Sequence, residues 1–432
     1  MSALTEQFVD WAWNLTPADL PPEVSRAARR HLLDGWGCAL AAARLGTARP
    51  ALAVAGQATA PPEAAVPGLA ARLPAGSAAF AIGALVHALD FDDTHPVALV
   101  HPTAVVLPVL SAVGQLTGAG PAELETAAVC GYEFVIRLGA AVPHGFHARG
   151  FHATSVCGVF AATLVAARLL GLTRSQAVSA LGIAGSTAAG SMEFLAAGTE
   201  TKALHPALAG QAAVTAARLA AAGATGPASI LEGRYGLFAA YLQAAPPQAL
   251  AGDLGERWEV TRIDLKPYPC CHLSHATLDA LGDAGYRADD LESCVIDLPE
   301  ASVPIVAEPR PSKVAPRTPY EAKFSLPWTA AALLIDGDVT VDTFTDIARP
   351  QVAALADRIA VRPVQFDYPP ATALGKVTLR TRSGAIVDAV ATRAGHADQD
   401  AVAVQKFVAN AGDGERSRAL AHSVLEDGWR NP

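Results

Sequence analysis

A long apolar segment that ends near His87 runs directly into three carboxylates within four residues, followed by a threonine. If the helix of that segment continues, His87, Asp90 and Thr94 share one face, because they recur at i, i+3 and i+7. Carboxylates at a helix C-terminus oppose the helix dipole, so capping does not explain the cluster. We therefore expect Asp90 and Thr94 to face a cavity. Asp92 and Asp93 are expected to cap or support it.

Three further polar clusters interrupt the otherwise apolar sequence, at 144–152, 200–205 and 264–275. Imidazole groups titrate near neutral pH and ammonium groups hold negative charge, so both suit proton abstraction next to a carboxylate. His152 directly precedes an expected helix start, where the helix dipole favours a bound anion and a neutral imidazole. Lys202 is expected to hold a carboxylate or a developing enolate.

The last of these clusters contains four side chains that can ligate metals, Cys270, Cys271, His272 and His275. Their spacing lacks the paired Cys-x₂-Cys arrangement of structural zinc sites, so we predict no metal here. We expect this segment to bring Lys266 and one histidine into a cleft between two domains. The sequence leaves open whether that histidine is His272 or His275.

The composition indicates a soluble, closely packed helical protein. The chain has 432 residues, of which 51% are hydrophobic and 17% charged, and this length suits two domains. The mean hydropathy is +0.27, but the apolar stretches are too short or too interrupted to span a bilayer. The N-terminal residues show neither a basic region nor a cleavage pattern, so we expect a cytoplasmic protein.

Charge and missing motifs narrow the class of function. The net charge of −9 and the absence of a basic run argue against nucleic-acid binding. Six cysteines in a chain of this length favour free thiols in a reducing compartment. No dinucleotide-binding, Walker or iron–sulfur motif occurs, so we predict no cofactor and expect acid–base chemistry on a small di- or tricarboxylic acid.

Hydrophobic periodicity divides the chain into a helical part and a mixed part. Up to residue 257 the pattern predicts helices separated by loops. Alternating segments that predict strands then follow, at 258–264, 294–298, 359–364, 376–381 and 385–390. The last two flank a hairpin signal. We predict a mainly α protein, with an all-helical domain of residues 1–257 and 393–432 and a smaller α+β domain of residues 258–392.

Several motifs resemble the MmgE/PrpD family over nearly the whole chain and in the family's order. They are His87-Ala-Leu-Asp90-Phe-Asp-Asp-Thr94, His101-Pro102, Gly150-Phe-His152-Ala-Thr, Lys202-Ala-Leu-His205, Leu231-Glu-Gly and Lys266-Pro-Tyr-Pro-Cys-Cys271. This family includes 2-methylcitrate dehydratase, cis-aconitate decarboxylase and iminodisuccinate epimerase. The resemblance implies a large all-helical domain built from both chain ends, a smaller α+β lid domain, a metal-free active site between them, and a homodimer.

The resemblance also implies a set of site residues. The residues that match the site of the decarboxylase branch are Asp90, Thr94, His101, His152, Lys202, Lys266 and the Cys271/His272 region. We predict a cofactor-independent, dehydratase-like lyase. In it His101 or His152 transfers the proton, Asp90 orients a histidine, and Thr94 supports the substrate. The two lysines hold carboxylates and stabilise enolate charge.

Four alternatives stay open at the level of sequence. The first is an epimerase or isomerase of an iminodisuccinate-like acid, with His101 and His152 as opposed proton carriers. The second is a decarboxylase of the cis-aconitate type. The third belongs to a different class, a metal-dependent hydrolase that uses Asp90, His95, His101 and His152. The fourth is a catalytically inactive homologue that only binds a ligand, against which the full set of site residue types argues.

Overall fold

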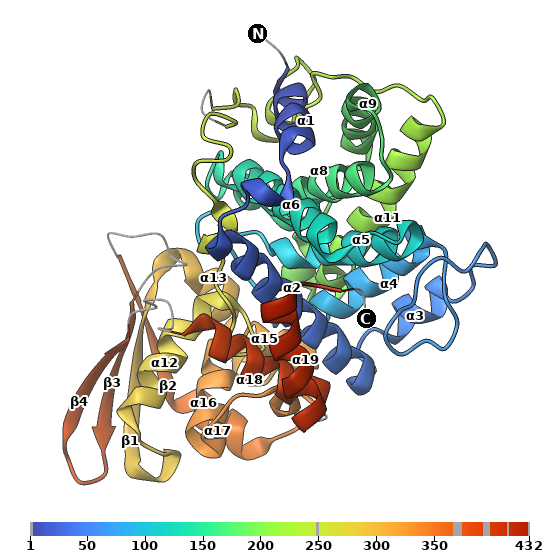
Figure 1. Ribbon diagram of the computed structural model, residues 1–432. Coiled ribbons are helices and arrows are strands. Elements are labelled where there is room, and N and C mark those ends of the chain that lie inside the picture. Colours follow the sequence, from blue (N-terminus) through green and yellow to red (C-terminus); the bar gives the residue numbers. More distant parts are fainter. Residues whose placement is uncertain (1–2, 248–249, 366–373, 392–397, 413, 431–432) are drawn as a thin grey trace.

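A computed structural model describes residues 3–247, 250–365, 374–391, 398–412 and 414–430 (Figure 1). The described chain is mainly helical and has one four-stranded sheet. The helices of the first half are α1 (Leu4–Asn14), α2 (Pro22–Leu45), α3 (Arg49–Ala55), α4 (Ala75–His87), α5 (Pro102–Thr117), α6 (Pro121–Ala140), α7 (Gly145–Ala148), α8 (Ala153–Leu169), α9 (Arg174–Ala184), α10 (Glu193–Ala197) and α11 (Thr201–Ala221).

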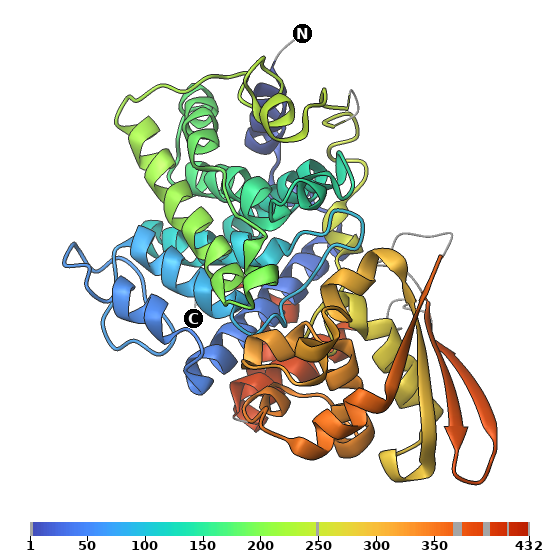
Figure 2. The ribbon, with the colours of Figure 1, turned by 180° about the vertical axis from the view of Figure 1, so that it is seen from behind.

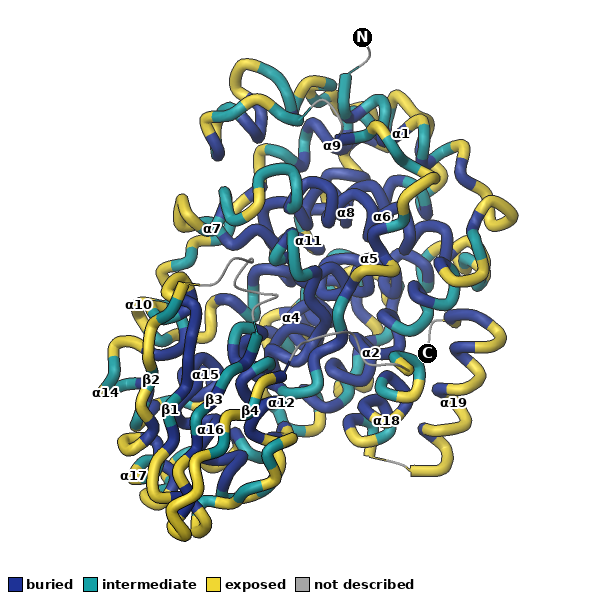
Figure 3. Tube along the Cα trace, turned by 90° about the vertical axis from the view of Figure 1, so that its left-hand side faces the viewer, coloured by how far each residue is buried: buried dark blue, intermediate teal, exposed yellow. Residues whose placement is uncertain are grey.

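Helices α4, α5, α8 and α11 form the centre of the first hydrophobic core, and Figure 3 shows α5 and α8 as an almost continuous buried trace. Helix α5 starts with Pro102, whose missing N–H costs nothing at a first helical position. Every residue of α5 from Pro102 to Gly114 is buried. A helix that is apolar on all sides is stable only when it is surrounded, and here α4, α6, α8 and α11 surround it.

The second half forms a smaller core around the sheet. Its elements are α12 (His275–Ala284), β1 (Leu291–Pro299), α13 (Val303–Val306), α14 (Arg310–Val314), α15 (Pro319–Lys323), α16 (Leu326–Asp336), α17 (Pro350–Arg358), β2 (Ile359–Val364), β3 (Gly375–Thr381) and β4 (Ile386–Ala391). The strand order is β2-β1-β3-β4, and Figure 2 shows the sheet at the end of the molecule far from α1. Helix α12 packs against β3 and β4.

Four of the five predicted strands are confirmed. Strands β1 and β2 are parallel, with Cys294 opposite Ile359, and the other neighbouring pairs are antiparallel. The hairpin signal between β3 and β4 is also confirmed, because Gly384 supplies a φ of +87° in the turn. The predicted strand 258–264 is wrong: Glu259–Arg262 is a 3₁₀ turn that packs against α2 and α6 instead of pairing with the sheet.

The end of the chain returns to the first core. Helices α18 (Gln399–Ala411) and α19 (Gly414–Asp427) lie beside α2 in Figure 1, and Phe407 and Trp429 are buried in the core of the N-terminal helices. The predicted domain boundary after residue 257 is not tested by these contacts. The second boundary, between residues 392 and 393, lies outside the described residues.

Among the described residues, none of the helices combines the length and the apolar character that crossing a lipid bilayer requires. All six cysteines are free thiols and all are buried.

Gly83 permits the close approach of α4 to α11. A β-carbon at this position would lie 2.8 Å from the Cα and 2.9 Å from the backbone N of Ala207. Because the obstacle is backbone, we expect Gly83→Ala to lower the free energy of unfolding by about 1–3 kcal/mol. Urea unfolding of the variant measures this loss.

Gly76→Ala in the same helix is the matched control. The nearest atom to its added β-carbon is a Val214 methyl group at 4.0 Å, so the substitution keeps or raises stability, by at most about 1 kcal/mol. Equal urea midpoints for the two variants would contradict the packing argument.

Candidate active site

The loop between α4 and α5 carries the acidic cluster, and it is not helical. Helix α4 ends at His87, and Asp90 adopts a φ of +50°, in the left-handed region that non-glycine residues rarely occupy. The predicted helical face of His87, Asp90 and Thr94 is therefore wrong. The turn still directs Asp90 and Thr94 into one cavity, because contacts from distant segments hold the loop.

Asp90 lies between two lysine ammonium groups. Its Oδ1 accepts a hydrogen bond from Lys202 Nζ and lies 3.3 Å from Lys266 Nζ, which also donates to the Asp90 backbone oxygen at 2.8 Å. Burial acts to raise the pKa of Asp90, but the two ammonium groups outweigh it and hold that pKa below its usual range. Burial acts to lower the pKa of Lys266, but Asp90 and Asp92 outweigh it and raise that pKa. Asp90 and Lys266 are therefore charged at neutral pH.

Backbone pairing and one helix bring the two lysines to Asp90. Thr94 and Asp264 exchange backbone hydrogen bonds of 3.0 and 2.9 Å, which places Lys266 beside the loop. Lys202 lies in the first turn of α11, a helix that packs along α4. The ion pair thus joins three segments that are far apart in the sequence.

His101 presents a neutral imidazole to the cavity. Its Nδ1 lies 2.9 Å from the backbone oxygen of Asp93 and 3.1 Å from Thr94 Oγ1. A carbonyl oxygen only accepts, so Nδ1 carries the proton and Nε2 keeps its lone pair. Burial, together with the charges of Lys202 and Lys266, holds the pKa of His101 well below its ordinary value of 6.5. His101 is therefore set up to accept a proton.

His152 is the second imidazole at the cavity, and it pairs with His205. The two Nδ1 atoms are 3.1 Å apart, so one ring donates and the other accepts. Burial and the charge of Lys202 hold the pKa of His152 well below its ordinary value, and burial lowers the pKa of His205 to about 4. His205 lies three residues after Lys202 on α11, so one helix positions both the cation and the partner of His152.

Asp92 and Asp93 stabilise the loop through hydrogen bonds to the helices on either side of it. Both oxygens of Asp92 lie within 3.0 Å of His87 Nδ1. Asp93 accepts a hydrogen bond from the backbone N–H of Thr103, in the first turn of α5. The expected capping and supporting roles thus exist, but Asp93 caps the following helix and not the preceding one. Burial raises the pKa of Asp93 to about 7.

A cavity of about 330 Å³ gathers most of the predicted site residues. It is lined by Asp90, Thr94, His101, His152, Lys202, Lys266, Cys271 and His272. His275 does not line it: this residue is fully buried, and its Nε2 lies 3.0 Å from the Cys270 backbone oxygen. The structure thus places His272, and not His275, at the cavity. Burial raises the pKa of the Cys271 thiol, so it is not a thiolate at neutral pH.

Sequence reasoning left two groups out of the selected site. His147, on the short helix α7, and His144, directly before it, line the cavity, and the histidine-rich sequence around them was the available signal. Apolar residues such as Phe194 and Phe324 form another part of the lining. Nothing in the sequence distinguishes these from ordinary core residues, because their position depends on how the two halves of the chain pack.

Three imidazoles lie close enough together to hold a metal ion. Ring nitrogens of His87, His101 and His152 are all within 4.8 Å of one another. His87 Nδ1 is bound to the carboxylate of Asp92, and His87 Nε2 is buried without a hydrogen-bond partner among the described residues. A histidine held by a carboxylate through its other ring nitrogen is a common arrangement of metal ligands. His95, expected in the metal-site alternative, lies elsewhere and pairs with Glu259 at 3.3 Å.

Curated proteins similar to this chain carry related names. A "Cis-aconitate decarboxylase-like protein oryM" of Aspergillus oryzae is 26% identical over 98% of this chain and 94% of its own length. A "Cis-aconitate decarboxylase" of Homo sapiens is 29% identical, covering 86% of this chain and 78% of its own. One of Aspergillus terreus is 28% identical, covering 67% and 62%.

Family profiles match nearly the whole chain. The MmgE/PrpD N-terminal domain matches residues 6–250, and the MmgE/PrpD C-terminal domain matches residues 268–430. The second match runs through α18 and α19, which pack on the N-terminal helices. With an acidic loop, two lysines and two neutral histidines around one cavity, and with both profiles matched in order, this chain belongs to the MmgE/PrpD family.

Proposed function

We propose that this protein is a cofactor-independent lyase that acts by acid–base chemistry next to a carboxylate of a small di- or tricarboxylic acid. The observation that carries the proposal is the pairing of unlike groups in one cavity. Two neutral imidazoles, His101 and His152, line the same space as the ammonium groups of Lys202 and Lys266. The imidazoles move protons, and the cations hold negative charge.

The charges of Asp90, Lys202 and Lys266 favour the binding of an anion in the cavity. Asp90 neutralises one of the two ammonium charges, so the group of three carries a net positive charge. A substrate carboxylate restores neutrality in a region where water is largely excluded, and there its interaction with the lysines is stronger than in water. Asp90 holds both lysines in place and raises the pKa of Lys266.

The same residues serve two lyase reactions. In dehydration, Nε2 of an imidazole takes the proton from the carbon next to a carboxylate. The electron pair of that C–H bond forms the double bond, and the imidazolium formed in this step gives its proton to the hydroxyl group, which leaves as water. In decarboxylation, the bond to the departing carboxylate breaks, carbon dioxide leaves, and the electron pair that remains on carbon takes a proton from an imidazole that solvent has first protonated. The names of the relatives favour decarboxylation over the dehydration expected from sequence.

We also propose that residues 258–392 form an α+β lid on an all-helical domain of residues 1–257 and 393–432. The cavity draws Lys266, Cys271 and His272 from the first of these and Asp90 and His101 from the second. A movement between them would open the site to substrate and close it against water. The homodimer and the cytoplasmic location stay predictions from sequence.

Incubation with a panel of di- and tricarboxylic acids, followed by proton NMR, tests the reaction class. We expect loss of carbon dioxide or water from one of them. His101→Ala should lower kcat/KM about 10²–10⁴-fold, because a positioned acid–base group contributes that much. His422→Ala, which removes an exposed histidine on α19, should leave it unchanged.

Two outcomes would contradict this assignment. Near-normal turnover by His101→Ala would show that His101 does not transfer the proton. Incorporation of solvent deuterium into recovered substrate, without loss of carbon dioxide or water, would establish the epimerase alternative instead.

The pH dependence of kcat/KM reports on the lysines. Proton abstraction needs neutral His101, whose pKa is depressed, so activity persists below pH 6.5 and falls only as the pH passes that lowered pKa. In Lys266→Met one repelling cation is gone, so the pKa of His101 rises and the acid limb moves to higher pH. One substrate is used throughout, so its own ionisation is common to all profiles.

Lys376→Met is the control, because this exposed lysine lies 3.7 Å from Asp297 on the sheet and is not among the cavity residues. Its profile should coincide with that of the unmodified protein. An acid limb that stays in place in Lys266→Met would show that Lys266 does not set the protonation of the base.

A metal-dependent hydrolase is the second candidate, because His87, His101 and His152 converge. Against it, the ammonium groups of Lys202 and Lys266 already supply positive charge at the same cavity. We expect lyase activity to survive exhaustive dialysis against a chelator, with far less than one metal ion per chain by elemental analysis. Activity that disappears on chelation and returns with Zn²⁺ would favour the metal enzyme.

A further inference from the structure

The cavity is lined by two chemically different groups of side chains. The charged and proton-carrying residues surround Asp90. The apolar residues include Met192, Phe194, Leu195, Leu273, Ile305 and Phe324. The two groups adjoin, because Lys202 Nζ lies 5.2 Å from the centre of the Phe324 ring. The carboxylates of a compact tricarboxylate are suited to the first group, and their contact with the apolar residues would be unfavourable.

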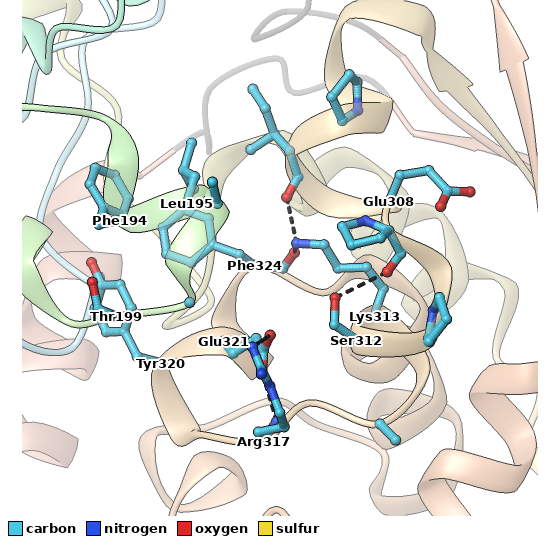
Figure 4. A pocket seen from close by; sticks show the side chains of 17 residues that line it. Phe194, Leu195, Thr199, Glu308, Ser312, Lys313, Arg317, Tyr320, Glu321 and Phe324 are labelled. Atoms are coloured by element: carbon cyan, nitrogen blue, oxygen red, sulfur yellow. Dashed lines mark hydrogen bonds and ion pairs between the residues drawn. The ribbon is translucent and has the colours of Figure 1, made fainter.

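The apolar group is shared in part with a second, larger cavity of about 800 Å³. Phe194, Leu195, Ile305 and Phe324 border both spaces. Figure 4 shows Phe194, Leu195 and Phe324 together on one side of the larger cavity, with Lys313, Ser312 and Glu308 across from them. The two spaces are therefore separated by apolar side chains and not by backbone alone.

The charged groups of the larger cavity are paired within the protein, whereas the buried Tyr320 hydroxyl has no hydrogen-bond partner among the described residues. Lys313 Nζ donates to the backbone oxygens of Ile305 and Phe324, both at 2.7 Å, as drawn in Figure 4. Arg317 pairs with Glu321 at 3.1 Å. These groups do not require an anion from a ligand. Lys313 also joins the two segments that carry Ile305 and Phe324 through these backbone hydrogen bonds.

We propose that the acid this enzyme acts on carries an apolar arm, an alkyl chain longer than methyl. The arm leaves the reacting end of the molecule, lies along Phe194, Leu195, Ile305 and Phe324, and extends into the larger cavity. This proposal rests on the lyase function proposed above and specifies its substrate class. The carboxylates meet Lys202 and Lys266, and the hydrophobic effect holds the arm.

A series of tricarboxylic acids with straight alkyl substituents of one to eight carbons tests the proposal. Each buried methylene group contributes enough binding free energy for about a fourfold gain, so kcat/KM should rise about fourfold per carbon over the first several carbons. If kcat/KM stays constant or falls as the substituent is lengthened beyond methyl, the proposed apolar arm is overturned.

Ile305→Trp enlarges a side chain that borders both cavities and so reduces the space for the arm. It should lower kcat/KM for the longest acid at least tenfold more than for the one-carbon acid. Ile386→Trp, the same substitution at a position on β4 that is 69% exposed, should change neither. Leu195→Trp repeats the test from α10 if Ile305→Trp fails to fold. If the variant that folds loses the same factor in kcat/KM for long and for short acids, the proposed position of the alkyl arm is contradicted.

Measurements of binding affinity distinguish a failure of the proposed apolar arm from a failure of the proposed lyase function. If no acid of any length is turned over, the lyase function fails, and calorimetric Kd values for the same series still test the arm. Affinity that rises with chain length and falls in Ile305→Trp or Leu195→Trp supports the apolar subsite. Affinity that is independent of chain length overturns it.

Discussion

The buried contact of one carboxylate with two ammonium groups organises this structure. Asp90, Lys202 and Lys266 are each nearly or fully buried, and a buried charge without a partner is strongly unfavourable. Each of the three therefore depends on the other two, although they come from the loop after α4, the start of α11 and the segment before α12. Any arrangement of the chain that separated them would leave an uncompensated charge in an apolar interior.

The loop that carries Asp90 is fixed from several directions, which explains its unusual backbone. Lys406 of α18 donates to the backbone oxygen of Phe91, and its ammonium group lies 3.8 Å from the centre of the Phe91 ring. Thr94 pairs with Asp264, and Asp93 binds the first turn of α5. A positive φ at a non-glycine residue costs free energy and persists only where surrounding contacts require it. Here the strained turn is what brings Asp90 to both lysines.

The same cations set the state of the histidines. A buried imidazole already resists protonation, and the lysines add to this by repulsion, so His101 and His152 stay neutral at neutral pH. Neutral imidazoles beside fixed cations can accept protons from a bound acid while that acid's carboxylates are held. The apolar residues of the same lining, among them Phe194 and Phe324, add a hydrocarbon surface next to these charged groups.

The sequence by itself determined the mainly helical class, four strands and most of the residues around the cavity. Periodicity and turn signals are local, and histidines and lysines in an apolar chain are conspicuous.

The prediction from sequence failed where contacts between distant segments override the local conformational preference. The expected helical face through Asp90 and Thr94 does not exist, because the lysines, Lys406 and the pairing with Asp264 impose a turn. The alternating segment 258–264 forms no strand of the sheet, because it packs against α2 and α6. Only the tertiary structure decided between His272 and His275, and only it produced the apolar part of the lining, since the packing of the two halves determines which side chains face the cavity.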